Sequence, residues 1–362
     1  MGPGAAIGLG RFGYSLLLPA MQSALQLTLA QAGALGSANT GGYLVGAVIS
    51  HKVLAAVGYR RGFYAALLLQ GVALLLMGLA PSIGVMVVLR AVQGVLGAFV
   101  FVGGAALLLA SGGRAGALGA YFGGVGGGIA LSVLILPLAA DWRLGWLALG
   151  TLSLLMAATS LLPVRSLREP APPVLGRGGS LAPIALAMLV YALYGAGYIG
   201  YMTFVTSGVS GSLLLFWLVL GLATLFNGAV WGWVVARWGG AAGIRLSMVL
   251  LVIASLEPLL RAAPLLSAAL FGVSFLGVIT AITDLFRLKL PPGAWPRAMA
   301  LSTAVFALGQ ALGPGVAGLI GDLTAGVSGS LWAATTLLAA GLGASLLPLG
   351  RSDRGRGVGG AG

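Results

Sequence analysis

The chain has 362 residues, of which 59% are hydrophobic and only 7% are charged, and its mean hydropathy is +1.07. A water-soluble domain carries about a quarter charged residues, so this composition excludes an ordinary globular protein. The absence of cysteine excludes disulfides, thiol catalysis and cysteine-ligated metals. The apolar stretches approach the roughly 20 residues that cross a bilayer, which predicts an all-α polytopic membrane protein.

The predicted elements are twelve membrane-spanning helices. In chain order we expect them at residues 4–22, 33–56, 63–80, 84–109, 117–139, 143–163, 181–206, 212–236, 244–260, 265–287, 298–321 and 327–349. The first stretch lacks a basic leader region and a clear cleavage site, which favours a retained first helix over a signal peptide. Because it starts only ten residues before Arg11, we expect it to be short at its cytoplasmic end.

The basic residues between the spans lie almost entirely on one side. Fifteen Lys or Arg residues fall in or beside the even-numbered connections and the tail, whereas only Arg143 and Arg261 fall on the opposite face. The positive-inside rule therefore predicts a bacterial-type inner-membrane protein with both termini in the cytoplasm. The same rule accounts for the net charge of +13, and we expect no nucleic-acid partner.

Residues 164–180 form the longest polar connection and are rich in proline and glycine, which forbids a continuous helix. We interpret them as a cytoplasmic linker between six-helix bundles at 1–163 and 181–349, followed by a basic tail at 350–362. Short sequences also recur about half a chain later: Gly46-Ala47-Val48 as Gly228-Ala229-Val230, Gly13-Tyr14 as Gly197-Tyr198, and Asp141 as Asp322. The common offset predicts two parallel repeats of six helices.

Several longer motifs accompany this repeat. They are Gly8-Leu9-Gly10-Arg11-Phe12-Gly13-Tyr14, Leu17-Leu18-Pro19-Ala20-Met21, Ala32-Gly33, Ser37-Ala38-Asn39-Thr40-Gly41-Gly42-Tyr43-Leu44-Val45-Gly46-Ala47, Arg90-Ala91-Val92-Gln93-Gly94, Asp141-Trp142-Arg143, Tyr194-Gly195-Ala196-Gly197-Tyr198-Ile199, Thr203-Phe204, Gly309-Gln310 and Gly313-Pro314. With them the chain resembles the major facilitator superfamily, and more narrowly its YbfB/YjiJ-type branch. The resemblance covers spans 1–2, 4–7 and 11.

The resemblance implies two six-helix bundles and secondary transport. It also implies a conformational-coupling role for Arg90 with Gln93, and for Arg60 and Arg61 in the loop between spans 2 and 3. Ala55 stands where the superfamily carries an aspartate in that loop, which argues against a gate built on that acid.

Arg11 and Arg90 are the two arginines in the interior of predicted spans, away from their ends, and Arg11 is expected near the bilayer midplane. A charged group there is costly and usually faces a cavity or a partner. Since no midplane acid is visible to pair with either residue, a guanidinium in a wet cavity would suit a carboxylate or another anion. The alternative is that each arginine hydrogen-bonds backbone carbonyls at a helix break, or that Arg90 extends outward.

The remaining binding candidates are uncharged polar groups within spans. Tyr191, Tyr194, Tyr198 and Tyr201 share one face of span 7, and Tyr198 is the repeat counterpart of Tyr14. We predict a contribution to a substrate cavity from Tyr14, Asn39, Tyr43, Tyr194, Tyr198, Asn227 and Gln310, beside Arg11. Packing between helices is the alternative for each of them.

Glu257 is the candidate for proton coupling, because the other acids sit at helix ends, in the linker, in the tail or near Arg287. The alternative is that Glu257 begins the outer loop with Pro258 and is simply solvated. No zinc motif, phosphate-binding loop, Ser–His–Asp set or close pair of intramembrane acids is present, so we expect no enzyme, cofactor or metal site.

These observations favour a secondary transporter that moves a small organic solute, with an anionic group, by alternating access. Efflux of hydrophobic or aromatic compounds is the second hypothesis, and a non-transporting receptor or scaffold is the third. The expected partners are the substrate, membrane lipid and a coupling proton, and we expect a monomer.

Overall fold

The structure is a computed structural model, and it describes residues 1–112, 115–170, 180–260, 262–291 and 294–349. Predictions about Arg114, Arg177, Arg261 and the tail at 350–362 lie outside these residues. Within the described ranges the regular elements are helices, as the composition predicted.

The first half of the chain forms one group of helices. Its elements are the π-helix η1 (Gly4–Phe12), α1 (Gly13–Leu25), α2 (Leu29–Val57), α3 (Tyr59–Leu79), α4 (Ile83–Ala110), α5 (Ala115–Ile135), the 3-10 turn η2 (Leu136–Leu138) and α6 (Trp142–Ser166). Within this group α2 packs on α4, α3 packs on both α4 and α6, and α5 packs on η1.

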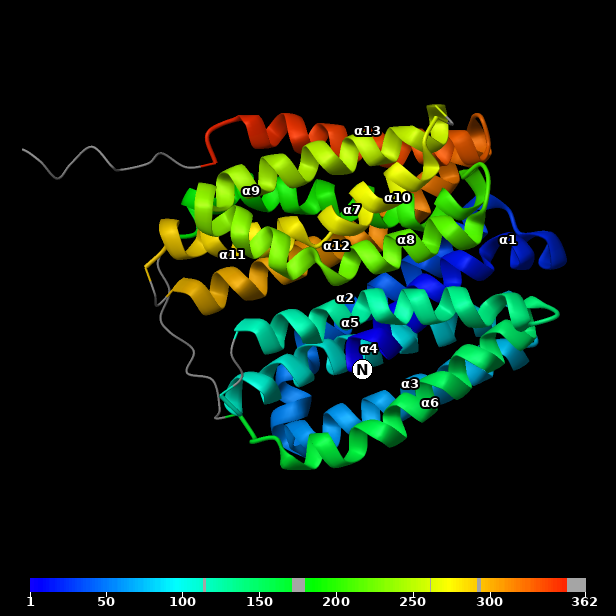
Figure 1. Ribbon diagram of the computed structural model, residues 1–362, viewed down its shortest axis with the longest axis horizontal. Helices are drawn as coiled ribbons and strands as arrows, with labels where there is room; N and C mark the ends of the chain where they lie inside the picture. Colours follow the sequence, from blue (N-terminus) through cyan, green and yellow to red (C-terminus); the bar gives the residue numbers. More distant parts are fainter. Residues whose placement is uncertain (113–114, 171–179, 261, 292–293, 350–362) are drawn as a thin grey trace, which may run out of the picture.

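The second half forms a similar group after the linker. Its elements are η3 (Ala182–Ile184), α7 (Ala185–Gly208), α8 (Leu213–Leu225), α9 (Asn227–Leu260), α10 (Pro264–Ser274), α11 (Gly277–Lys289), α12 (Trp295–Leu323) and α13 (Val327–Leu346). The two groups meet along two seams, α2 with α12 and α5 with α8 (Figure 1).

Ten helical segments in the described part of the chain are long and apolar enough to cross a membrane. The pair η1–α1 and the pair formed by α8 with the start of α9 complete twelve passes. The fold predicted from sequence is therefore confirmed as an all-helical, multi-pass membrane architecture of two six-helix groups.

Two of the predicted spans, 8 and 10, are interrupted, and their prediction as single helices is wrong. Span 8 divides at Phe226, and α9 turns at Gly239, whose φ is 80°, to serve spans 8 and 9. Span 10 breaks between Ser274 and Gly277, where side chains from neighbouring helices replace the lost helical hydrogen bonds. Asn227 Nδ2 donates to Val273 O at 2.8 Å and Ser247 Oγ donates to Ser274 O at 3.1 Å.

We define the linker end as the end where α6 passes into residue 167, and the far end as the opposite one, where α2 begins. Hydrogen bonds between the two halves of the described chain lie from the middle of the helices to the far end. Asp322 accepts from the amides of Leu29 and Ala30 at 2.9 and 2.8 Å, and Thr40 Oγ1 donates to Gln310 O at 2.8 Å. The halves are thus joined at the far end.

Candidate functional site

Arg11 lies where η1 passes into α1, about halfway between the two ends, and is 6% exposed. Its Nε donates to Asn39 Oδ1 at 3.2 Å, and its Cζ lies 4.7 Å from the ring centroid of Tyr43, so two residues of α2 hold it from the first half. From the second half, the Tyr198 hydroxyl lies close enough for an electrostatic interaction with the guanidinium. Its Nη2 is buried and has no hydrogen-bond partner among the described residues. Arg11 therefore lies between the two halves, with its Nη2 unpaired among the described residues.

The second half contributes Tyr198 from α7 and Gln310 from α12. Gln310 Nε2 donates to the Tyr198 hydroxyl, while Gln310 Oε1 is buried and has no hydrogen-bond partner within the described ranges. The Tyr198 ring stacks on Tyr194 at 5.0 Å and on Phe306 at 5.9 Å between centroids. The wall that faces Arg11 is therefore aromatic, with hydrogen-bonding groups at its edge.

Arg90 on α4 has a different environment, although it is also buried, at 1% exposure. Its Nη1 donates to Gly10 O at 2.7 Å and to Gln93 Oε1 at 3.0 Å, and its Nε donates to Leu35 O at 3.4 Å. Gln93 Nε2 in turn donates to Ala73 O at 3.0 Å. The Arg90–Gln93 pair therefore joins spans 1, 2, 3 and 4 of the first half. This arrangement matches the alternative in which Arg90 hydrogen-bonds backbone carbonyls at a helix break. The irregular η1 supplies one of the carbonyls that it binds.

Close backbone packing fixes Asn39 against Arg90. Asn39 Nδ2 donates to Arg90 O at 3.1 Å, while a Cβ added to Gly94 would lie 1.9 Å from Asn39 O. Such an approach tolerates only glycine at that position. The Arg-x-x-Gln-Gly motif therefore places both arginines: Arg90 directly, and Arg11 through Asn39.

Three other predicted site residues lie in structural contacts. The Tyr14 hydroxyl donates to Ala32 O at 2.7 Å, and its ring lies 4.6 Å from Arg90 Cζ. Tyr194 donates to Phe275 O, and Asn227 donates to Val273 O, both at the break in span 10. The structure thus brings together Arg11, Asn39, Tyr43, Tyr198 and Gln310, and it does not bring Asn227 into that cluster.

A small void beside Arg11 has a volume of about 10 Å³. Its lining comes from spans 1, 2, 4 and 7 and comprises Arg11, Tyr14, Ser15, Gly36, Thr40, Arg90, Ile199 and Thr203. A space of this size holds about one water molecule. A larger solute requires the two halves, or the side chains between them, to move apart.

The five described acids all accept backbone N–H groups at the starts of helices, a role that sequence reasoning missed for most of them. Their amide partners are Leu144 for Asp141, Tyr59 and Arg60 for Glu169, Ala263 for Glu257, Gly240 for Asp284, and Leu29 and Ala30 for Asp322. The N-terminal end of a helix carries partial positive charge, which favours a carboxylate there. These capping contacts leave no ion pair for Arg11 or Arg90 in the described part of the chain.

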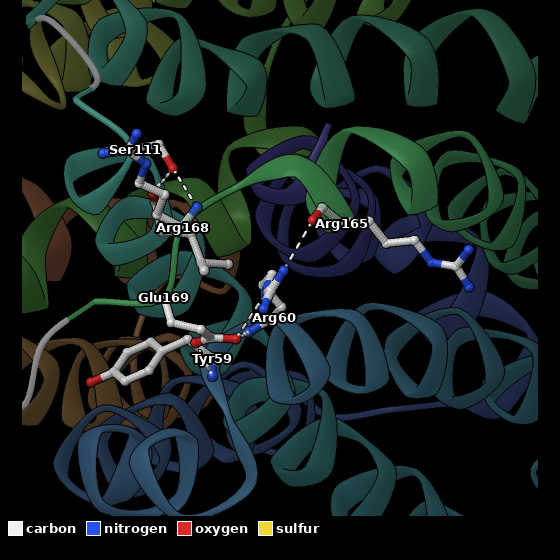
Figure 2. A network of polar contacts seen from close by, with 7 residues as sticks. Tyr59, Arg60, Ser111, Arg165, Arg168 and Glu169 are labelled. Atoms are coloured by element: carbon white, nitrogen blue, oxygen red, sulfur yellow. Dashed lines mark hydrogen bonds and ion pairs between the residues drawn. The ribbon is translucent and has the colours of Figure 1, made fainter.

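Arg60 and Arg61 begin α3 at the linker end. Arg60 Nε lies 3.0 Å from Glu169 Oε1, the one ion pair among the described residues, and Arg60 Nη1 donates to Arg165 O at 3.0 Å (Figure 2). Burial raises the pKa of Glu169, but the hydrogen bonds from Arg60 and Tyr59 outweigh it and hold that pKa below its ordinary value. Glu169 thus provides an acid near the place where Ala55 replaces the superfamily's aspartate.

The fold and the polar cluster between two helical halves define a membrane transporter of the major facilitator type. The chain belongs to the family described as "Uncharacterised MFS-type transporter YbfB", whose profile matches residues 4–346. The resemblance drawn from the sequence motifs is confirmed.

Solved structures show the same fold. A mutant of the nucleoside transporter NupG matches with a TM-score of 0.71 and 12% identity, over 95% of this chain and 96% of that one. NupG itself matches with a TM-score of 0.67 and 13% identity, over the same shares. A bacterial homologue of the human lysosomal transporter Spinster, in an inward-facing and occupied conformation, matches with a TM-score of 0.66 and 16% identity, over 95% of this chain and 94% of that one. Among curated protein sequences, none matches the chain.

Proposed function

We propose that this transporter carries a small organic anion, and that Arg11 binds the anionic group. The carrying observation is the buried Arg11 Nη2, which has no hydrogen-bond partner in the described part of the chain and lies where both halves of the molecule meet. A guanidinium donates to carboxylate or phosphate oxygens in a planar fork, so an unused nitrogen beside a used one suits such a group.

Charge supports the same proposal. Two arginines line one small void, and the described acids are all bound to helix ends elsewhere. An uncompensated charge in the middle of a membrane protein is costly. An anion from solution would reduce that cost, whereas a cation would increase it.

The position of the contacts between the halves supports alternating access as the mechanism. We place the linker end in the cytoplasm, from the distribution of basic residues. The far end, closed by Asp322, then faces outward, so the substrate would reach Arg11 from the cytoplasmic side once the halves move apart there. Transport would require the Asp322 contact to open while the linker ends of the halves close.

Ligand-dependent stabilisation provides the test. Purified protein is heated with each member of a panel of small organic acids and with the neutral amide of the same compound. An acid that binds raises the melting temperature, because it stabilises only the folded state, and its amide does not. Arg11→Gln keeps a hydrogen-bonding side chain beside Asn39 but removes the charge, so it should abolish the shift.

Flux in proteoliposomes completes this test with the acid so identified. We expect Arg11→Ala and Arg11→Lys both to lose uptake, since Lys keeps the charge but lacks the planar fork. Undiminished uptake by Arg11→Ala would leave Arg11 with a structural role only.

One observation favours the second hypothesis, efflux of hydrophobic compounds. A crevice of about 340 Å³ lies near the far end and is lined by apolar residues of both halves, among them Leu16, Leu17, Val133, Leu213 and Leu214. A lipophilic compound could enter it without passing Arg11. Melting-temperature shifts that survive Arg11→Gln but disappear in Leu17→Trp, which fills the crevice, would support this function.

A further inference from the structure

The groove between α3 and α6 at the linker end has features that neither the transport site nor the family assignment explains. It has a volume of about 420 Å³ and is lined by Arg60, Arg61, Tyr64, Leu161, Val164, Arg165 and Glu169. Residues 60, 61 and 64 form one face of α3, and residues 161, 164 and 165 form one face of α6. α3 and α6 thus each present one face to the same groove.

The groove changes from basic to apolar with depth. Arg60, Arg61 and Arg165 lie at the helix ends, whereas Tyr64 and Leu161 lie about one turn further along α3 and α6. The lower walls of the groove are therefore a phenol ring and aliphatic side chains, directly below the arginines.

The groove has more basic side chains than acidic ones, with three arginines and one glutamate. Glu169 pairs with Arg60, and this pair is held further by the bond from Arg60 Nη1 to Arg165 O. Only the backbone carbonyl of Arg165 takes part in that network, and its guanidinium extends away from Glu169 (Figure 2). Neither the Arg61 nor the Arg165 guanidinium has a hydrogen bond or ion pair with the described residues, so the groove keeps two uncompensated positive charges.

The outer sides of α3 and α6 are suited to lipid. Leu69 and Leu76 on α3 and Leu155 and Leu162 on α6 are exposed, Leu162 at 75%. Large apolar side chains exposed over the length of a spanning helix face acyl chains. The groove therefore opens where the headgroup layer meets the hydrocarbon layer.

We infer that this groove binds an anionic phospholipid, with its phosphate between Arg61 and Arg165 and an acyl chain along Leu161 and Tyr64. Basic pockets between membrane helices bind anionic headgroups in this way. A soluble phosphate compound would match the arginines but not the apolar lower walls, whereas a phospholipid matches both.

The test measures lipid binding by native mass spectrometry of the full chain in detergent. Phosphatidylglycerol is titrated against phosphatidylcholine with the same acyl chains, and separate samples receive inorganic phosphate or glycerol 3-phosphate. We expect tight binding of phosphatidylglycerol alone. Each arginine near an anionic lipid contributes about 1 kcal/mol, or roughly fivefold in affinity, so Arg61→Gln with Arg165→Gln should weaken binding about 30-fold.

A matched control removes two arginines from the same end of the second half. Arg237 and Arg287 are exposed and have no hydrogen bond or ion pair with the described residues, so Arg237→Gln with Arg287→Gln should leave affinity unchanged. Leu161→Glu keeps both groove arginines and should also weaken binding, which provides an independent test if the double variant does not fold. Equal phosphatidylglycerol affinity in the groove variants and wild type would overturn the inference. So would an equal loss in the control, or binding of glycerol 3-phosphate as tight as that of the lipid.

Discussion

The two buried arginines lie at the same small void, yet their surroundings differ in one decisive respect. Arg90 donates to two backbone carbonyls and to Gln93, all within the first half. Arg11 has one side-chain hydrogen bond, an aromatic ring beneath it, and a nitrogen without a hydrogen-bond partner at the boundary between the halves. A charge whose hydrogen bonds all lie within its own bundle stabilises that bundle, while a charge with a buried, unpaired nitrogen at the boundary between the halves is available to a ligand.

The largest expected effect comes from replacing each arginine by leucine. Arg90→Leu removes two hydrogen bonds to other helices and one to Gln93 within α4. Each contributes about 0.6 kcal/mol in a membrane protein, so we expect a loss of roughly 2 kcal/mol of stability. Arg11→Leu removes one such bond and also an uncompensated charge, so its stability should stay within about 1 kcal/mol of wild type. Unfolding by detergent titration measures both. Equal destabilisation would remove the distinction between the two arginines.

Next in size are changes to the tyrosine hydroxyl groups beside the two arginines, Tyr198 near Arg11 and Tyr14 near Arg90. Tyr198→Phe keeps the aromatic stack but loses the hydroxyl that faces Arg11, and we expect the affinity for the anion to fall about tenfold, which corresponds to 1.4 kcal/mol. Tyr14→Phe loses a bond to Ala32 O beside Arg90 and is the matched control, with affinity unchanged. Isothermal titration with the acid found in the melting screen compares them. A loss confined to Tyr14→Phe would place the binding site on the Arg90 side.

A smaller effect is expected at Glu257, which accepts from the Ala263 amide at 2.9 Å where α10 begins. Glu257→Gln retains a carbonyl oxygen for that bond and removes the proton-binding carboxylate. We expect uptake driven by an imposed pH gradient to continue, because the carboxylate serves as a cap. Loss of gradient-driven uptake, with exchange of labelled substrate intact, would instead identify Glu257 as the proton site.

The smallest expected effect is the dependence of stability on pH through the ionisation of Glu169. Its folded pKa lies below its ordinary value near 4.5, so its contribution to stability is present above that value and is lost as the pH falls through the folded pKa. The pair with Arg60 is half exposed, with side-chain exposures of 44% and 37%, and such pairs contribute less than about 1 kcal/mol. Melting temperatures of wild type and Glu169→Gln should differ at neutral pH and converge in acid. If the two melting temperatures differed by the same amount at every pH, the ionisation of Glu169 would make no contribution to stability.

The sequence was sufficient for the architecture, and all five residues of the polar cluster were among its candidates. Hydropathy and basic-residue spacing predicted the passes, and the midplane position of Arg11 predicted an exceptional residue. Asn39 and Tyr43 could be predicted beside it because they share one face of one helix. The breaks in spans 8 and 10 could not be predicted, because Asn227 and Ser247 stabilise carbonyls that lie on another helix. The capping role of Asp322 was also beyond prediction, since its partner amide at Leu29 is 293 residues away.

The contact between Asp322 and the start of α2 has a consequence for genetics. One partner is a side chain, but the other is the main chain at positions 29 and 30, which side-chain substitutions there leave unchanged. An alanine scan of α2 would therefore overlook the closure of the far end, and no second-site replacement on α2 could restore charge pairing after Asp322 is lost. Proline is the informative exception. It lacks the amide hydrogen and is well tolerated in the first turn of a helix, so Leu29→Pro deletes one donor while leaving the helix and the carboxylate in place.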